Sequence, residues 1–166
     1  MRLIVTDANI LIDLEVGQLL DVIFDLEEVE FLVPDVLFVE ELEASMGHLP
    51  ARGLNVVTLS EAVIADVEVL RARYPEPGSN DLLALGLAKA EQCLLLSGDG
   101  ALRTAAIAEQ VDVHGTLWLI EKLRDAGLVD AAQVKKAYDL MKAGGSRLPW
   151  GEVAAQLRRW GLGIQM

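Results

Sequence analysis

Cysteine, histidine and long apolar runs are scarce in this chain of 166 residues. The one cysteine, Cys93, excludes an internal disulfide and is typical of a protein from a reducing cytoplasm. The two histidines, His48 and His114, are far apart in the sequence and make a poor start for a zinc site. No apolar run approaches the roughly 18 residues of a membrane-spanning helix, and the first residues lack the apolar region of a signal peptide. We therefore expect a cytoplasmic protein.

Basic side chains are also few, and they are unevenly distributed. The formal net charge is −12. Residues 1–50 carry one basic and twelve acidic side chains, residues 51–100 carry four and seven, and residues 101–166 carry nine and seven. Most of these charges are expected to lie on solvated helix faces. Any attraction for phosphate must come from the C-terminal third or from bound metal ions.

Short apolar runs alternate with helical patterns along the chain, which predicts a parallel sheet covered by helices on both faces. We expect a three-layer α/β/α sandwich with four to five strands, formed by residues 1–115, and a helical C-terminal extension at residues 116–166 that packs on this core or at an interface. The expected strands lie at residues 3–5, 31–33, 55–59, 93–96 and 111–113. The expected helices lie at residues 10–26 with a break at Gly17, 35–46, 60–74, from 79 or 80 onward, after 100, and at 117–126, 131–143 and 152–160. A loop is expected around Gly47 and Pro50.

Three aspartates follow strands or begin helices in this predicted order. Asp7 follows the first strand directly, and Asp99 follows the fourth after two intervening residues. Asp81 lies in the first turn of the helix after the Pro-rich loop at residues 75–78. Parallel sheets bind ligands at the carboxyl ends of their strands, and converging carboxylates repel one another unless a cation neutralises them. The placement predicts a divalent metal site that activates water for phosphoryl displacement.

Each aspartate also has an ordinary structural explanation when it is taken alone. Asp7 and Asp99 are good N-caps for the helices that follow them. Asp81 complements the dipole of its helix. All three fall in the expected order and in the expected loops, and this combination favours a functional site over three unrelated caps.

The predicted helix at residues 35–46 adds a glutamate to this set, and two positions compete for the role. At about 3.6 residues per turn, Glu41 borders the apolar stripe of the helix and Glu40 points further toward solvent. The number of residues between Pro34, at the end of the second expected strand, and the glutamate favours Glu40 instead. We choose Glu41. The expected apolar stripe consists of Phe38, Val39, Leu42 and Met46.

Residues near the acids are candidates for supporting roles. Asn9 and Ser97 are positioned to hydrogen-bond the acids or a water molecule, with capping and turn formation as the alternative. Arg103, one turn beyond Asp99, is a candidate contact for a substrate phosphate, with a surface ion pair as the alternative. The tryptophans are candidates for base stacking, although their apolar neighbours favour packing roles. They are Trp118, Trp150 and Trp160.

Four segments of the chain resemble, in order, the motifs of PIN domains. Residues 7–14, DANILIDL, are similar to the opening motif of the family, and residues 39–42, VEEL, to the motif that carries its glutamate. Asp81 ahead of LGLA at residues 85–88 matches the third acid, and LLLSGD at residues 94–99 matches the fourth. The similarity covers about residues 3–115, and the helical tail resembles only some branches of the family.

The resemblance implies an endoribonuclease that uses Mg²⁺ or Mn²⁺ bound by Asp7, Glu41, Asp81 and Asp99 and leaves 5′-phosphate and 3′-hydroxyl ends. Members of the family are often the toxin of a VapC-type toxin–antitoxin pair, so an antitoxin is an expected partner besides RNA. The apolar residues of the tail also favour a homodimer or a bound partner segment, with packing on the chain's own domain as the alternative.

Two other functions compete with this interpretation. An aspartate-nucleophile phosphatase of the haloacid dehalogenase type also begins with an aspartate after the first strand, but it needs a second aspartate where this chain has Asn9. A degenerate PIN fold could serve as a protein- or RNA-binding module without catalysis. The presence of all four acids argues against such a loss.

Overall fold

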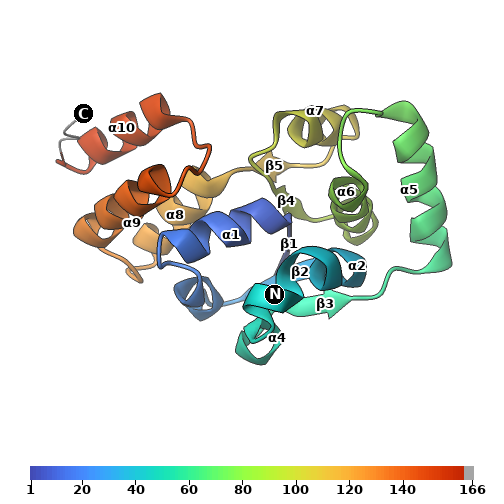
Figure 1. Ribbon diagram of the computed structural model, residues 1–166, viewed down its shortest axis with the longest axis horizontal. Helices are drawn as coiled ribbons and strands as arrows, with labels where there is room; N and C mark the ends of the chain where they lie inside the picture. The colour runs from blue at the N-terminus through green and yellow to red at the C-terminus, as the bar shows by residue number, and fades with distance from the viewer. Residues whose placement is uncertain (163–166) are drawn as a thin grey trace.

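Within residues 1–162, the part of the chain that the computed structural model describes, five short strands form one parallel sheet (Figure 1). Their order in the sheet is β3-β2-β1-β4-β5. Ile4 and Val5 of the central strand are almost fully buried, as parallel strands are when helices cover both faces. The strands are β1 (Arg2–Thr6), β2 (Val29–Pro34), β3 (Asn55–Val57), β4 (Leu94–Leu96) and β5 (Val113–His114).

The central strand β1 lies between β2 and β4, and this position determines which loops meet. Thr6 at the end of β1 pairs with Leu96 at the end of β4, and the Asp7 amide donates to the Leu96 carbonyl at 3.0 Å. The residues that follow these two strands therefore leave the sheet at the same edge, here called the carboxyl edge. The chain steps from β1 to β2 on one side and reaches β4 on the other. The carboxyl edge between β1 and β4 is thus the switch point at which open α/β sheets bind ligands.

Helices cover both faces of the sheet (Figure 1). On one face α6 (Ser79–Glu91) packs against β1, β2 and β4, and α5 (Glu61–Arg73) lies outside it. On the opposite side α1 (Ala8–Val16) packs against α9 (Ala131–Ala143). The other helical elements are η1 (Asp21–Asp25), α2 (Asp35–Leu37), η2 (Phe38–Leu42), α3 (Glu43–Met46), α4 (Leu49–Arg52), α7 (Gly100–Ala108), α8 (Thr116–Asp125) and α10 (Trp150–Arg159).

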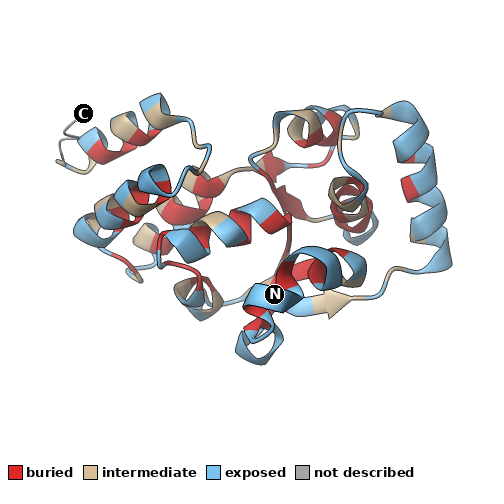
Figure 2. Ribbon diagram, in the orientation of Figure 1, coloured by how far each residue is buried: buried red, intermediate tan, exposed pale blue. Residues whose placement is uncertain are grey.

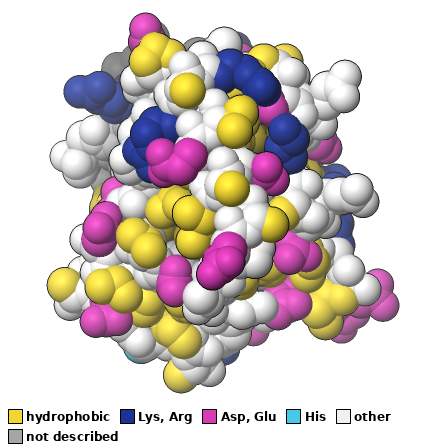
Figure 3. Space-filling model, turned by 90° about the vertical axis from the view of Figure 1, so that its right-hand side faces the viewer, with side chains coloured by type: hydrophobic (Ala, Val, Ile, Leu, Met, Phe, Trp, Pro, Cys, Tyr) yellow, Lys and Arg dark blue, Asp and Glu magenta, His cyan; other side chains and the backbone are white. Residues whose placement is uncertain are grey.

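The buried side chains form one continuous core, while α5 remains largely exposed (Figure 2). Only Val67 and Leu70 of α5 are fully buried, and they face α6. Ile64 and Val69 on the same helix are exposed apolar side chains. Seen from the side of α5, the surface mixes apolar and acidic side chains, and the basic ones gather toward its upper part (Figure 3).

The C-terminal helices share this core. The apolar surface on which we based the expected homodimer or antitoxin contact is largely covered inside the chain, so it no longer supports a partner. The division at residue 115 stays a prediction, and the last part of the expected extension, residues 163–166, lies outside the described residues. The fully buried members of that surface are Leu119, Ile120, Leu123, Val134, Tyr138 and Met141.

The predicted three-layer sandwich is confirmed, and the differences from it are local. The break expected at Gly17 is confirmed, because α1 ends at Val16, but the second part of the expected helix is the 3-10 helix η1. The loop expected around Pro50 is wrong, because the short helix α4 begins there and proline suits the first turn of a helix. Strand β5 begins two residues later than expected, at Val113. No helix within residues 1–162 has the length and hydrophobicity that a membrane crossing demands.

Candidate active site

Asp7 lies at the carboxyl edge directly after β1 and is only 1% exposed. It caps α1, because its Oδ1 accepts a hydrogen bond of 3.0 Å from the Ile10 amide. Its Oδ2 is buried and has no hydrogen-bond partner among the described residues. A buried carboxylate oxygen without a partner is energetically costly. The capping role that we gave as the alternative explains Oδ1 but not Oδ2.

Burial is the largest cause of a raised pKa at Asp7, which reaches about 6. The Ser97 hydroxyl and the Ile10 amide lower it in part, and the charges of Asp81 and Asp99 raise it further. The three aspartates predicted from the sequence therefore lie close enough to act on one another electrostatically. A proton or a cation at Asp7 relieves both the burial and the repulsion.

Asp99 reaches the same edge from β4. It caps α7, its Oδ2 accepting from the Leu102 amide at 2.9 Å. The fully buried Ser97 lies between the two aspartates: its Oγ accepts from the Asp99 amide at 3.1 Å, and its hydroxyl lowers the pKa of Asp7. Ser97 therefore contacts the Asp99 backbone and acts on the Asp7 carboxyl, and its supporting role stays a prediction.

Asp81 approaches the edge from the first turn of α6. Its Oδ2 accepts from the Gly78 amide at 3.2 Å, which fixes the start of the helix. Burial raises the pKa of Asp81, the Gly78 amide opposes this shift, and the charges of Asp99 and Glu41 add to it. Asp81 therefore lies close enough to both Asp99 and Glu41 for their charges to raise its pKa.

The glutamates lie on η2, which is a π-helical segment rather than the regular helix that we expected. A π-helix advances by a smaller angle per residue, so the expected apolar stripe is wrong at Val39, which is 59% exposed. Glu40 and Glu41 are both exposed, and only Glu41 acts on the pKa of Asp81. π-helical segments often occur at functional sites.

Asn80 is a residue of the site that the sequence analysis treated only as a possible helix start. Its Nδ2 donates to Glu40 Oε2 at 2.8 Å and to Glu41 Oε2 at 3.2 Å. It therefore holds both glutamates next to Asp81, its neighbour in the chain. The only signal in the sequence was this adjacency of an amide and an acid.

Two other predicted residues lie nearby without touching the acids. Asn9 lines a cavity together with Asp99. Arg103 donates through Nη1 to the Ser97 carbonyl at 3.0 Å, so it is held beside the site by the backbone, and the described residues include no ion pair for it. The tryptophans pack against charged or aromatic neighbours: Trp118 stacks on His114, and basic side chains lie over Trp118, Trp150 and Trp160.

The donor set fits a hard divalent cation by its chemistry. Four carboxylates at one edge, one of them with a buried oxygen that lacks a partner, are the oxygen ligands that Mg²⁺ and Mn²⁺ prefer. Their present positions do not close around a common point: among residues 1–162, no three acidic, histidine or cysteine side chains are placed to hold an ion together.

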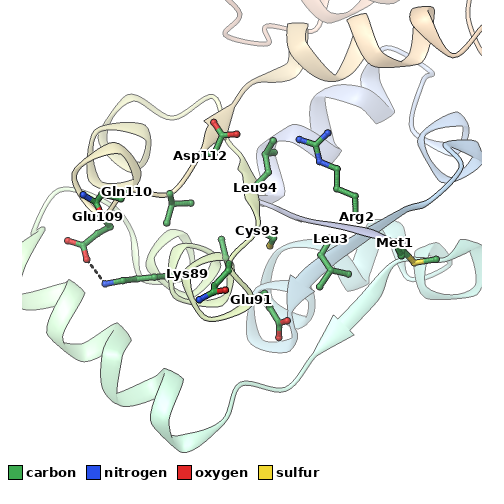
Figure 4. A pocket seen from close by; sticks show the side chains of 13 residues that line it. Met1, Arg2, Leu3, Lys89, Glu91, Cys93, Leu94, Glu109, Gln110 and Asp112 are labelled. Carbon is green, nitrogen blue, oxygen red and sulfur yellow. Dashed lines mark hydrogen bonds and ion pairs between the residues drawn. The ribbon is translucent and has the colours of Figure 1, made fainter.

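A larger cavity of about 670 Å³ lies at the opposite edge of the sheet (Figure 4). It is lined by the first residues of β1 and β4 and by Lys89 and Glu109, which form an ion pair of 2.6 Å. None of the four acids lines it, and its buried acid is already paired. We therefore take the carboxyl edge as the candidate site.

The fold and the acidic edge together define a parallel α/β/α domain with a carboxylate site at its switch point. The sequence matches the family model described as PIN domain over residues 3–162, so the chain belongs to the PIN-domain family. The predicted membership is confirmed, and the match extends beyond residue 115 through the C-terminal helices. PIN domains are generally nucleases and typically use divalent metal ions. No curated protein matches this sequence.

Proposed function

We propose that this protein is an endoribonuclease that depends on Mg²⁺ or Mn²⁺ and uses Asp7, Glu41, Asp81 and Asp99 as its catalytic and metal-binding residues. The observation that carries the proposal is the buried Oδ2 of Asp7, which has no partner among the described residues and lies within the influence of two other aspartates. The nearby Ser97 hydroxyl lowers the pKa of Asp7 only in part, so the burial of this carboxyl stays largely uncompensated. Membership of a family of nucleases supports the reaction class.

The role proposed for each residue follows from its position in the fold. Asp7 and Asp99 are held rigidly, because each caps a helix with one oxygen and keeps the other available. Asp81 approaches from α6 and Glu41 from η2, and Asn80 donates a hydrogen bond to the glutamate. A bound Mg²⁺ or Mn²⁺ ion would neutralise these carboxylates, lower the pKa of an attacking water molecule and stabilise charge on the phosphodiester oxygens. Arg103, fixed beside Ser97, is available for a substrate phosphate.

The direct test is cleavage of a defined RNA by the purified chain. With Mn²⁺ we expect internal cuts that leave 5′-phosphate and 3′-hydroxyl ends, and with excess EDTA we expect none. Asp7→Asn is the matched control, because asparagine also caps helices and removes only the charge. Full activity in EDTA would contradict the metal dependence, and equal loss of fold and activity in Asp7→Asn would mark Asp7 as a structural cap.

We further propose that the protein acts in the cytoplasm as the toxin of a toxin–antitoxin pair, on the basis of the family resemblance and of the lone Cys93. A homodimer stays an expectation from the sequence alone, because the tail residues on which it was based are mostly buried within the chain. Growth arrest on expression, relieved by co-expression of a neighbouring small gene, would support the toxin role. Sedimentation at micromolar concentration separates a monomer from a dimer.

A further inference from the structure

A groove runs from the candidate active site along the loop that joins α9 to α10, residues 144–149. Two adjoining cavities of about 480 and 530 Å³ form it. The first reaches Asp99 and Asn9, and the second reaches Arg103 and His114. The residues that line both are Gly98, Thr116, Arg147 and Leu148.

Close packing fixes the α9 end of this loop on α1. A Cβ atom at Gly17 would lie only 2.6 Å from Met141 Cε, and one at Gly144 would lie 2.9 Å from Val16 Cγ1. The Met141 methyl is the end of a flexible side chain and can move aside, whereas a Cβ atom at Gly144 would also lie 3.2 Å from the backbone carbonyl oxygen of Leu140. The packing of α9 against α1, where Gly144 leaves room for Val16, places the start of the loop beside Asp99.

A buried polar network fixes the other end of the loop. Gln156 of α10 is 2% exposed and accepts a hydrogen bond from the Tyr138 hydroxyl of α9. Its Nε2 donates to the Leu117 carbonyl at 3.1 Å and to Glu121 Oε2 at 2.8 Å, both on α8. Since buried amides of this kind need all their partners, α10 is held in one position and the loop has two rigid supports.

Arg147 is the cation that this loop presents to both cavities. It is exposed, and within residues 1–162 it forms no ion pair. Four acids at the neighbouring edge repel any anionic substrate, so a positive charge held beside them compensates part of this repulsion. A guanidinium also matches the geometry of a phosphate better than an ammonium does, because it donates two parallel hydrogen bonds.

We infer that the groove binds a single strand of RNA and that Arg147 binds a phosphate next to the one that is cleaved. The inference rests on the proposed ribonuclease function and adds the path of the strand and a residue that positions it. Cavities of this size suit one or two nucleotides each, and a double helix cannot enter them with its bases paired. The C-terminal helices thereby form one wall of the substrate site.

The test measures the binding of a fluorescent single-stranded 12-mer RNA to the Asp7→Asn chain, which does not cut it. Adding Arg147→Gln should raise the Kd about tenfold and reduce the salt slope of binding by about 0.7. Arg147→Lys should restore part of the affinity. The matched control is Arg158→Gln, the same change at an exposed cation of α10 that lines a different cavity, and it should alter the Kd by less than about twofold.

Each outcome separates this inference from the ribonuclease proposal. Equal Kd values for the Arg147 and Arg158 variants, or no RNA binding at all, would overturn the inference. Equal affinity for a 12-base-pair duplex would overturn the single-strand assignment. RNA binding that depends on Arg147, without any cleavage by the unchanged protein in Mn²⁺, would contradict the ribonuclease and leave the groove intact.

Discussion

The two edges of the sheet each contain a carboxylate with little access to solvent, and the neighbours of these two carboxylates differ. At the edge opposite the carboxyl edge, here called the amino edge, Glu109 has a side chain that is 5% exposed and pairs with Lys89 (Figure 4). It also accepts hydrogen bonds from Arg73 and Tyr74. The bond from Lys89 is the largest cause that lowers the pKa of Glu109 to about 2. At the carboxyl edge Asp7 has no cationic partner within residues 1–162, and burial raises its pKa to about 6. Glu109 ties α5, α6 and α7 together, whereas Asp7 keeps an oxygen unused. The contrast separates an acid that stabilises the fold from one that is available for chemistry.

The largest expected effect concerns Asp99, which shares the edge with Asp7. Asp99→Asn should reduce RNA cleavage in Mn²⁺ by at least about a hundredfold, because it removes a charge that the proposed metal site needs. The melting temperature should change little, since asparagine keeps the cap on Leu102. Single-turnover cleavage beside a thermal melt measures both. A comparable loss in each would place Asp99 with the structural acids.

The pH dependence of stability should distinguish the two edges. The raised pKa of Asp7, from 3.8 to about 6, means that this group stabilises the fold below pH 3.8 and loses that contribution as the pH rises through 6. In metal-free buffer the wild-type chain should therefore gain about 2–3 kcal/mol relative to Asp7→Asn between pH 7 and pH 4. The lowered pKa of Glu109 stabilises the fold above its ordinary value of 4.5, and this contribution is lost only as the pH falls from 4.5 through about 2. Urea unfolding across this range tests the prediction, and a difference that stays constant with pH would contradict it.

A substitution of Glu109 at the amino edge should change the stability of the fold and leave RNA cleavage unchanged. Glu109→Gln should lower the free energy of unfolding at pH 7 by about 1–2 kcal/mol, less than three hydrogen bonds would suggest, because Lys89 and Arg73 are about half exposed and screened by water. Cleavage of RNA should be unchanged. Glu91→Gln, at an exposed acid lining the same cavity, is the control and should cost less than about 0.5 kcal/mol. Lost cleavage in Glu109→Gln would remove the distinction between the edges.

The smallest effect concerns the choice between the two glutamates of η2. Asn80 donates to both, but only Glu41 acts on the pKa of Asp81. Glu41→Gln should therefore reduce kcat about tenfold, and Glu40→Gln by less than about twofold. Steady-state cleavage of one RNA by both variants decides the matter. A larger loss of kcat in Glu40→Gln than in Glu41→Gln would instead support Glu40 as the metal-site glutamate.

The parts of the fold and of the site that could be predicted are those with local signals. Apolar runs of strand length, each followed by Asp7 or by Ser97 and Asp99, place these side chains at the end of a buried strand. A parallel sheet then brings such ends together whatever the details of the loops. The order of strands and helices needed nothing more than this alternation.

The other parts depend on contacts between distant segments. The π-helical turn in η2 leaves no periodic signal, so Val39 was expected inside and lies outside. Asn80 meets its glutamates only because α6 packs beside η2. The burial of the tail depends on how closely α9 approaches α1, which a single glycine, Gly144, permits without any pattern.

Binding of Mn²⁺ to the whole chain, followed as a shift in melting temperature at pH 7, tests most directly whether the carboxyl edge is a metal site. A ligand at a hundred times its Kd stabilises the folded state by about 2.7 kcal/mol, which a melt resolves easily. We predict a saturable increase for the wild-type chain, an equal increase for Glu109→Gln, and little or none for Asp7→Asn. An increase of the same size in Asp7→Asn, or none in the wild-type chain, would contradict the assignment of this edge as the metal-binding site.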